Sequence, residues 1–226
     1  MIVSSLDSLM VRKLGLRPWN TVVQAMCQFT NQRSQKTLDE VWLVEHPPVF
    51  TQGQSGKIKN IFILNQIPVM QSDRGGQLTY HGPGQQIMYV MIDLKRRSIT
   101  TRQLIDCIEK TIIDTLTFFS VVSHTQSRAP GVYVDDKKIG SLGLRIRKGC
   151  SYHGLSLNVN MDLTPFLHIN PCGYVGLKMT QLQEHKNSVT LTDVQPILIY
   201  NFARQLSISQ IHWIEENEIC SYEKTS

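Results

Sequence analysis

The run 86–94, Gln-Ile-Met-Tyr-Val-Met-Ile-Asp-Leu, is long and apolar enough to form the central strand of a sheet. A central strand has a neighbour on each side, so the rest of the chain has to supply further strands. Patterns typical of strands occur at 40–45, 67–70, 131–134, 139–146 and 150–160. We therefore expect this chain to fold around a sheet.

Three segments, 19–29, 100–119 and 192–206, carry apolar residues at the spacing of amphipathic helices. Each has a side chain near its start that is suited to capping. The expected caps are, in order, Asn20, Thr100 or Thr101, and Thr192 or Asp193. Beyond residue 206 we expect a strand and a frayed tail.

This order of elements predicts an α/β (α+β) fold with a mixed, largely antiparallel sheet flanked by helices. The strand patterns come early, are interrupted by one helix, resume, and are followed by another helix. No internal repeat, low-complexity segment or interdomain linker is apparent. Residues 1–226 are therefore expected to form a single domain.

Composition excludes several classes of protein. No apolar run approaches the ~20 residues that span a bilayer, and the N-terminal residues lack a secretory signal, so we expect no membrane contact and a cytoplasmic location. Five cysteines without a Cys-x-x-Cys pair argue against a disulfide framework and a zinc site. The net charge of +5 and pI near 9.0 suit an acidic partner, and a solvated basic surface explains them equally well.

One cysteine and one lysine lie in settings that suit chemistry better than packing. Cys172 stands between Pro171 and Gly173, which disfavour a helix and indicate a shaped turn with room for a ligand. Lys138 begins the second strand of a predicted hairpin, just before the glycine-spaced run 139–144. We therefore expect a cysteine nucleophile activated by a cation.

The segment 74–85 combines four glycines and a proline with Arg74, Tyr80 and His81. Such a segment contributes little to a core and costs conformational entropy, so a ligand-facing loop or hairpin explains it better than two ordinary turns. The polar segment 51–63 is a weaker candidate for a loop bordering the site.

Two further histidines carry less specific signals. His46, before two prolines, is expected to be a turn residue rather than a ligand. His153, beside Gly154 in a strand pattern, could line the site or fill a structural role, and the pattern leaves both open.

Seven short motifs, in order along residues 8–206, resemble those of the bacterial octanoyltransferases, also called lipoyl(octanoyl) transferases or the lipoate biosynthesis protein B family. Each motif alone is a weak signal of this family, and the seven motifs together are highly specific for it. They are Glu-His-Pro-Pro-Val-Phe (45–50), Arg-Gly-Gly-Gln-x-Thr-Tyr-His-Gly-Pro-Gly-Gln (74–85), Pro-Gly-Val-Tyr (130–133), Lys-Ile (138–139), Ser-Leu-Gly (141–143), His-Gly-Leu-x-Leu-Asn (153–158) and Pro-Cys-Gly (171–173).

The resemblance implies a cytoplasmic acyltransferase that moves an octanoyl group from acyl carrier protein to a lysine of a lipoyl domain, through a thioester on the enzyme. Its acceptors would be the lipoyl domains of 2-oxoacid dehydrogenase complexes and the glycine cleavage H protein. It implies a fold similar to the catalytic domains of biotin and lipoate ligases, and no metal, nucleotide or redox cofactor.

Residue by residue, the resemblance makes Cys172 the acylated nucleophile and Lys138 the residue that activates it. The segments that match the family's substrate-binding residues are Arg74, Gly75, Gly76, Gln77, Leu78, Thr79, Tyr80 and His81, then Ser141, Leu142 and Gly143, then Gly154, Leu155 and Ser156. His153 is a supporting candidate. After about residue 175 the match is loose.

Elementary electrostatics supports the same roles. A free cysteine is only a few per cent thiolate at pH 7, and an ammonium about 4 Å away favours the thiolate by roughly 4 kcal/mol at an effective dielectric of ~20, before desolvation. Once a thioester has formed, neutral Lys138 could accept the proton of the incoming amine. Backbone N–H groups near Cys172 and Gly173, or in the run 140–143, could hold the oxyanion, and the sequence does not choose between them.

Two other functions compete with this interpretation. An ATP-dependent lipoate or biotin ligase on the same fold would activate a free acid as an acyl-adenylate and would need no catalytic cysteine. A nucleic-acid-binding domain would fit the basic charge, yet no cluster of Lys and Arg interleaved with aromatic residues occurs beyond short runs such as 95–97, so no nucleic acid partner is expected.

Overall fold

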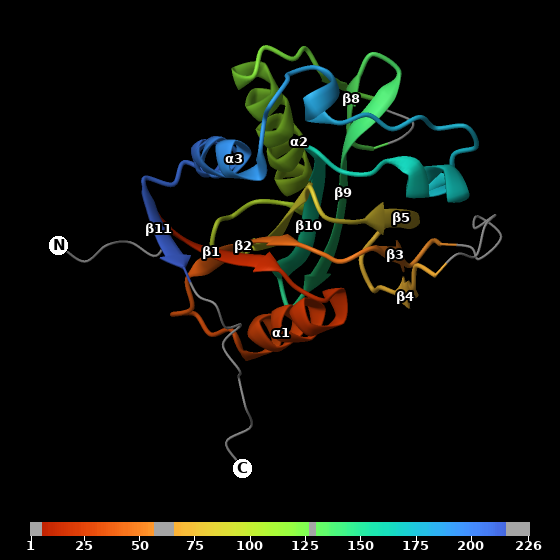
Figure 1. Ribbon diagram of the computed structural model, residues 1–226. Coiled ribbons are helices and arrows are strands. Elements are labelled where there is room, and N and C mark those ends of the chain that lie inside the picture. Colours follow the sequence, from red (N-terminus) through yellow and green to blue (C-terminus); the bar gives the residue numbers. More distant parts are fainter. Residues whose placement is uncertain (1–5, 57–65, 127–129, 216–226) are drawn as a thin grey trace.

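The structure is a computed structural model that describes residues 6–56, 66–126 and 130–215. Within these ranges the chain builds an eight-stranded sheet in the order β11, β1, β2, β6, β10, β9, β8, β7 (Figure 1). The expected central strand is observed as β6 (Gln85–Met91), which is buried along its whole length between β2 (Asp39–Glu45) and β10 (Cys150–Asn158). The other strands of this sheet are β1 (Ser8–Leu16), β7 (His124–Thr125), β8 (Val132–Val134), β9 (Lys137–Arg147) and β11 (Gln210–Glu215).

The pairing of these strands confirms the expected fold class. β1 pairs in parallel with β2 and β11, while the pairs from β2 through β6, β10, β9 and β8 to β7 are antiparallel. The sheet is therefore mixed and largely antiparallel. β1 itself was missed, because its apolar residues do not alternate regularly and a register shift interrupts it at Gly15.

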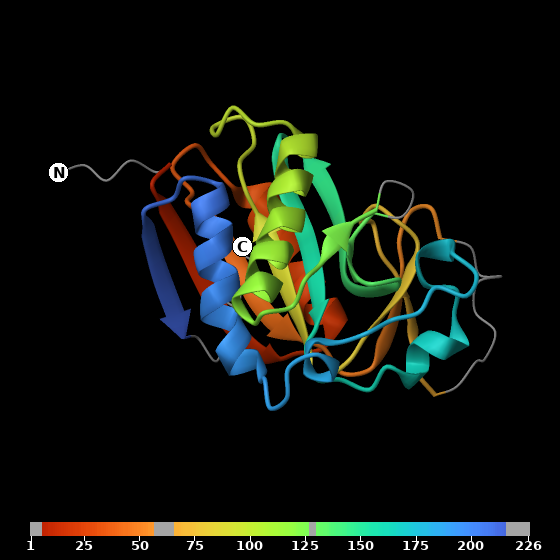
Figure 2. The same cartoon turned by 90° about the horizontal axis from the view of Figure 1, so that it is seen from above.

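Helices cover both faces of the large sheet. α1 (Trp19–Gln32) packs on one face, and α2 (Thr101–Phe118) and α3 (Leu191–Gln205) lie side by side on the other (Figures 1 and 2). The α2 and α3 side holds the larger apolar core, which includes Ile108, Ile112 and Phe202. The strands and helices predicted from apolar spacing thus form one layered arrangement.

The predicted helix caps are right for one helix and wrong for two. α2 is capped by Thr100, whose side chain accepts the N–H of Gln103, as expected. α1 starts directly after Pro18 with no side-chain cap, so Asn20 lies inside the helix. α3 is capped by Thr190, because Thr190 and Asp193 form a reciprocal capping box; Thr192 and Asp193 are already helical residues.

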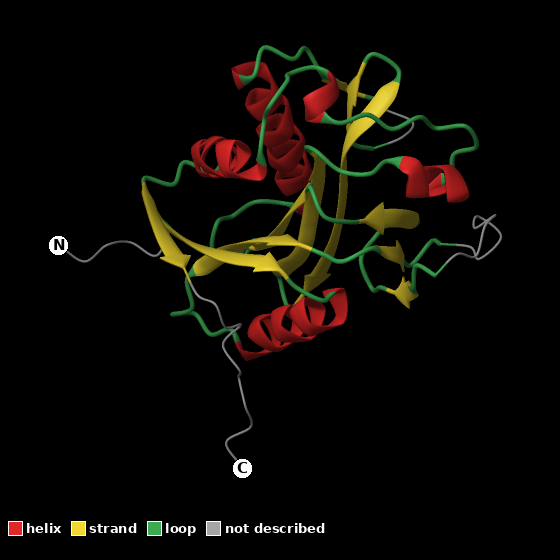
Figure 3. Ribbon diagram, in the orientation of Figure 1, coloured by secondary structure: helices red, strands yellow, loops and turns green. Residues whose placement is uncertain are grey.

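A small second sheet lies beside the large one and carries part of the loop 74–85 (Figure 3). Its order is β4 (Val69–Gln71), β3 (Val49–Gln52), β5 (Leu78–His81), so the strand expected at 67–70 is displaced toward its C-terminal end. Phe50, Tyr80 and Phe166 belong to a separate apolar cluster under this sheet. The cluster supports two short 3₁₀ turns, η2 (Thr164–His168) and η3 (Pro171–Gly173), and the second turn contains Cys172.

Two expectations from the sequence fall partly outside the described residues. The loop expected at 51–63 begins within β3 and continues through residues 53–56, and its remainder lies outside the described ranges. The strand expected after residue 206 is β11, and the tail after residue 215 lies outside the described ranges as well.

Candidate active site

Cys172 and Lys138 lie in contact although 34 positions separate them in the sequence. The Nζ of Lys138 is 3.2 Å from the Sγ of Cys172 and donates a second hydrogen bond of 2.7 Å to the carbonyl oxygen of Pro130. The lysine side chain is buried, with 1% of its surface exposed, whereas Cys172 is half-buried and lines a cavity. A cation this close to a thiol favours the thiolate form.

Cys172 lies on the shaped turn that the sequence predicts. Its φ of 55° is in the left-handed region, which costs a non-glycine residue of order 1–3 kcal/mol and needs support from the surroundings. Gly173 supplies part of that support, because its N–H donates to the Asn170 carbonyl at 2.9 Å. Gly173 has a φ of 77°, which strains any other residue, and a Cβ there would lie 2.0 Å from the side-chain oxygen of Gln77, so Gln77 would also have to move.

The segment that follows Cys172 is bound to the backbone of Lys138. The Lys138 N–H donates to the Lys178 carbonyl at 2.9 Å, and the Thr180 N–H donates to the Lys138 carbonyl at 3.0 Å. Met179 therefore pairs with Lys138 as an isolated parallel bridge. This bridge fixes the chain that follows Cys172 to the start of β9. It therefore helps to keep the Cys172 side chain, on its turn, beside the Lys138 side chain, on its strand.

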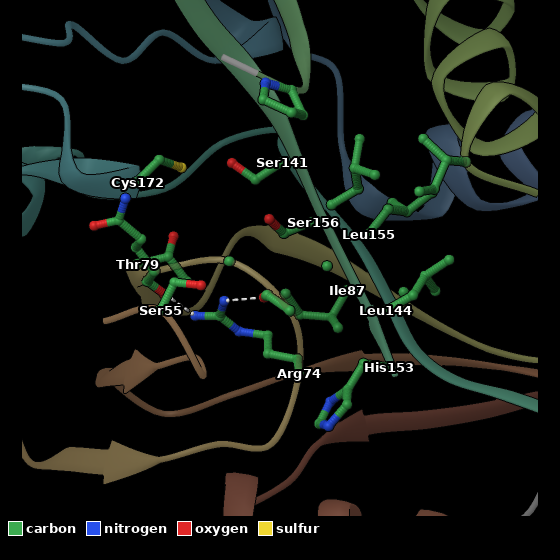
Figure 4. Close-up of a pocket in the computed structure, with 18 of the residues that line it drawn as sticks. Ser55, Arg74, Thr79, Ile87, Ser141, Leu144, His153, Leu155, Ser156 and Cys172 are labelled. Atoms are coloured by element: carbon green, nitrogen blue, oxygen red, sulfur yellow. Dashed lines mark hydrogen bonds between the residues drawn. The ribbon is translucent and has the colours of Figure 1, made fainter. Parts of the chain in front are cut away.

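A cavity of about 400 Å³ opens beside the Cys172 sulfur. In Figure 4 the sulfur points toward Ser141 and Ser156, and Leu144 and Leu155 lie farther along the cavity. This volume is within the range of about 300–1,000 Å³ that is usual for sites that bind small molecules. The apolar part of the lining includes Ile87, Ile105, Leu142, Leu144, Ile146 and Leu155.

Arg74 holds the glycine-rich loop 74–77 in place. Its guanidinium donates to the Thr51 carbonyl at 2.7 Å, the Gln77 carbonyl at 2.8 Å and the Gly75 carbonyl at 3.0 Å. The Gly75 N–H donates to the carbonyl of Leu144 in β9, and a Cβ at Gly143 would lie 2.9 Å from the Gly75 carbonyl. The glycines thus let the loop lie directly on β9. Burial lowers the pKa of Arg74, and the nearby Cys172 opposes that shift.

A chain of buried hydrogen bonds continues from Arg74 through His81. Arg74 donates to the Thr51 hydroxyl at 2.9 Å, and that hydroxyl is 3.2 Å from Nε2 of His81. The other ring nitrogen, Nδ1, is 2.7 Å from the Oε1 of Gln85, while the Gln85 amide N–H group donates to the carbonyl of Tyr80 and to Asn158. Nδ1 of His81 is therefore the donor and Nε2 the acceptor.

Burial lowers the pKa of His81 to about 3, which keeps the ring neutral and leaves it to orient its neighbours. His46 is neutral for the same reason: burial lowers its pKa to about 4. Its Nδ1 donates to the Arg17 carbonyl at 2.7 Å, and its Nε2 accepts from the hydroxyl of Tyr89 at 2.8 Å. His46 was expected in a turn, and it lies buried directly after β2.

His153 lines the cavity and belongs to a second polar cluster with Asp73 and Tyr152. Its Nε2 is 2.7 Å from the Asp73 carboxylate, which also accepts a hydrogen bond from the Tyr152 hydroxyl. The hydrogen bond from His153 lowers the pKa of Asp73 to about 2, and burial lowers the pKa of His153. A neutral histidine that donates to an ionised aspartate fits both shifts. Asp73 was missed, because nothing in the sequence distinguishes it from a turn aspartate.

The cavity brings together most of the residues that the sequence indicated. They are Arg74, Gly75, Gly76, Gln77, Leu78, Thr79, His81, Ser141, Leu142, Gly143, His153, Gly154, Leu155, Ser156 and Cys172. Tyr80 differs from these, since its ring packs between Phe50 and Phe166 in the separate apolar cluster. Pro130 also lines the cavity and Thr51 accepts hydrogen bonds from Arg74; both lie in segments that the sequence singled out, 130–133 and 51–63.

Three basic residues lie together at the end of β9 and directly after it. Arg145, Arg147 and Lys148 are exposed, and the first two alternate along the strand with Leu144 and Ile146, which line the cavity. Among the described residues, no group of three or more His, Cys, Asp or Glu side chains could hold a metal ion, and no helix is long and apolar enough to cross a membrane.

Comparison with known proteins identifies close relatives. Residues 21–203 match the model of the lipoyl protein ligase A/B catalytic domain. The chain is 62% identical over 210 residues to an octanoyltransferase of Erwinia tasmaniensis, covering 93% of this chain and 94% of the relative. It is 55% identical over 201 residues to an octanoyltransferase of Klebsiella pneumoniae, covering 89% and 94%.

Solved structures of more distant proteins have the same fold. A crystal structure of lipoate-protein ligase A bound with ATP is similar with a TM-score of 0.74 at 15% identity, covering 92% of this chain and 88% of that one. A biotin protein ligase from Aquifex aeolicus is similar with a TM-score of 0.53 at 10% identity, covering 89% and 70%. The expected likeness to lipoate and biotin ligases is confirmed at the level of the fold.

Proposed function

The chain belongs to the lipoyl protein ligase A/B catalytic domain family, and from this membership together with the pairing of Cys172 and Lys138 we propose that it is an octanoyltransferase. It moves an octanoyl group from acyl carrier protein to a lysine of a lipoyl domain, through a thioester on Cys172. The observation that carries the proposal is the 3.2 Å contact between Sγ and Nζ at the wall of a largely apolar cavity.

In the first half of the reaction, the Cys172 thiolate attacks the thioester carbonyl of the carrier-bound octanoyl group. The new C–S bond forms as the bond to the carrier sulfur breaks, and the departing thiolate takes a proton from the Lys138 ammonium. One thioester replaces another, so this half is close to thermoneutral. Lys138 is left neutral beside the acylated cysteine.

In the second half, the amine of the target lysine attacks the thioester on Cys172. Neutral Lys138 accepts a proton from the attacking amine, and the thiolate leaves as the amide forms. This returns the ammonium and thiolate pair to its starting state. Forming an amide from a thioester makes the half-reaction downhill.

Charge that develops on the carbonyl oxygen needs donors at the reacting centre. The Gly173 N–H already donates to Asn170, so it is not among them in the observed conformation. The Ser141 hydroxyl, on the side to which the Cys172 sulfur points, is better placed (Figure 4). In the first half of the reaction the Lys138 ammonium, 3.2 Å from that sulfur, is a second donor.

The apolar cavity suits the octanoyl chain. Leu142, Leu144 and Leu155 contribute aliphatic surface to it, and the loop 74–77 closes it on the side of Arg74. Burying each methylene of the chain contributes about 0.8 kcal/mol. Ser141 and Ser156 line the cavity on the side of Cys172, where the thioester would be, and Arg74 and His153 lie farther along it (Figure 4).

The partners follow from this activity. The donor is octanoyl acyl carrier protein, and the acceptors are lipoyl domains of 2-oxoacid dehydrogenase complexes and the glycine cleavage H protein. We place the reaction in the cytoplasm, because reducing conditions there keep a nucleophilic thiol free.

A ligase of the same family would need ATP, so the requirement for ATP tests the proposal. Purified protein is incubated with octanoyl acyl carrier protein and an apo lipoyl domain, and the lipoyl domain is weighed by mass spectrometry. We expect octanoylation without ATP and no stimulation by it. Product formed only from free octanoate and ATP would favour the ligase and contradict the proposal.

A further inference from the structure

We propose that Glu109, on α2, is a positioning residue that orients the Pro130–Gly131 peptide and through it presents Lys138 to Cys172. The inference rests on the proposed roles of those two residues. Glu109 does not touch the cavity; it acts on the far side of the lysine.

The two ends of a single peptide unit connect Glu109 to Lys138. The Gly131 N–H donates to Oε1 of Glu109 at 3.3 Å, and the Pro130 carbonyl of the same peptide accepts from Nζ of Lys138 at 2.7 Å. A carboxylate on the N–H side of a peptide polarises it, so the carbonyl oxygen becomes a stronger acceptor. The arrangement therefore supports the ammonium form of Lys138.

Close packing fixes the peptide against the lysine. Gly131 has a φ of 135°, and a Cβ there would lie 2.4 Å from Cε of Lys138 and 2.6 Å from the Gly140 carbonyl. Any other residue at this position would push the lysine stem aside. The hydrogen bond to Glu109 is thus one of the restraints that determine where Nζ lies.

Glu109 is an unusual residue for its place in α2. It is 9% exposed, close to the fully buried Ile108 and Ile112, and burial raises the pKa of its carboxyl. A buried carboxylate is costly unless other groups compensate it. The Gly131 N–H, Arg102 and Lys138 each act against the rise, and Asp106 adds to it.

The negative charge of Glu109 favours the ionised pair in the site, the Cys172 thiolate and the Lys138 ammonium. Nζ of Lys138 contacts both the Cys172 sulfur and the Pro130 carbonyl, and the N–H of the same Pro130–Gly131 peptide contacts Glu109. The charge of Glu109 also interacts directly with that of Lys138. A negative charge that is nearer to the ammonium than to the thiolate stabilises the ammonium more than it destabilises the thiolate. Glu109 therefore shifts the pair toward thiolate and ammonium.

The test measures the reactivity of Cys172 without any substrate. Wild type and Glu109→Gln are alkylated with iodoacetamide across pH 5.5–10, and the peptide containing Cys172 is quantified by mass spectrometry. Gln keeps an oxygen that can accept from Gly131 and removes only the charge. We expect the midpoint of the rate against pH to rise by on the order of half to one pH unit in Glu109→Gln.

Two controls separate positioning from general damage. Asp114→Asn removes a carboxylate elsewhere on the same helix, where it pairs with Arg204, and should leave the midpoint unchanged. In a Lys138→Met background Glu109→Gln should no longer move the midpoint, because the ammonium through which it acts is gone. Glu109→Ala also loses the hydrogen bond from the Gly131 N–H. It should therefore lower kcat more than Glu109→Gln does, and it should leave KM for the carrier unchanged.

The outcomes distinguish this inference from the proposed function. A Glu109→Gln protein with a lower Tm and an unshifted midpoint would show a purely structural role and overturn the inference. A wild-type midpoint near 8.5 that Lys138→Met does not alter would contradict the proposed roles of Cys172 and Lys138, and the inference would fall with them.

Discussion

Replacing Lys138 with Met removes the ammonium and keeps most of the volume of the buried side chain. At 3.2 Å the attraction between ammonium and thiolate is about 5 kcal/mol at an effective dielectric of ~20, before the cost of burial is subtracted. We expect this attraction to favour the nucleophilic form of Cys172 in wild type. Without it, a thiol of ordinary acidity is about 3% thiolate at pH 7, so acylation should slow about 30-fold.

The two halves of the reaction should respond differently to pH in Lys138→Met. Raising the pH from 7 to 9 restores the thiolate, so the rate of acylation should largely recover. Transfer from the acylated enzyme to a lipoyl domain should remain slow, because the base that accepts the proton of the amine is missing.

Both halves are measured by rapid quenching and intact-mass spectrometry, with a thermal melt to show that the protein is folded. The melt is needed because the Pro130 carbonyl loses its partner, at a cost of about 1–3 kcal/mol. A Lys138→Met enzyme that is acylated at the wild-type rate at pH 7, or whose slow acylation ignores pH, would refute the reasoning.

Three further predictions concern the surroundings of the site. Raising ionic strength should increase KM for the acidic carrier more than it lowers kcat, because salt screens the attraction of Arg145, Arg147 and Lys148, which are exposed beside the cavity. A KM that does not depend on salt would contradict this attraction. Arg74→Ala breaks the hydrogen bonds that hold the loop 74–77, so octanoyl transfer should slow at least tenfold while the circular dichroism spectrum stays native. Full activity at all substrate concentrations would show that the loop does not need Arg74. The pKa of Asp73 is depressed to about 2, so its contribution to stability is complete above about pH 4 and is lost as the pH falls toward 2. Over this pH range the urea midpoint of wild type should therefore fall more steeply than that of Asp73→Asn. Parallel curves for the two proteins would contradict the assignment.

The sequence predicted those parts of the molecule that local patterns determine. β6 was recognised from its unbroken apolar run, and the turn at Cys172 from its flanking Pro171 and Gly173. α2 was predicted with Thr100 or Thr101 as its cap, and Thr100, which pairs with Gln103 nearby in the sequence, is the one observed. The pairing of Cys172 with Lys138 was expected from the local setting of each residue and from the resemblance to a family, because the 34 positions that separate them give no local pattern.

The features that were missed depend on tertiary contacts. β1 lies parallel to β2 across an intervening helix, which no local pattern indicates. Tyr80 alternates along β5 with residues that line the cavity, so its ring faces Phe50 and Phe166 instead. Glu109 appears in the sequence as an ordinary helical glutamate, and only the approach of the Pro130–Gly131 peptide gives it a role.

The most direct test of the account is the identity of the acylated residue. Wild-type protein is incubated with octanoyl acyl carrier protein alone, and the intact protein and its peptides are weighed. The account predicts a single adduct of about 126 Da on Cys172, absent from Cys172→Ala and lost when an apo lipoyl domain is added. An adduct on Cys27, Cys107, Cys150 or Cys220, or octanoyl transfer by Cys172→Ala, would contradict it.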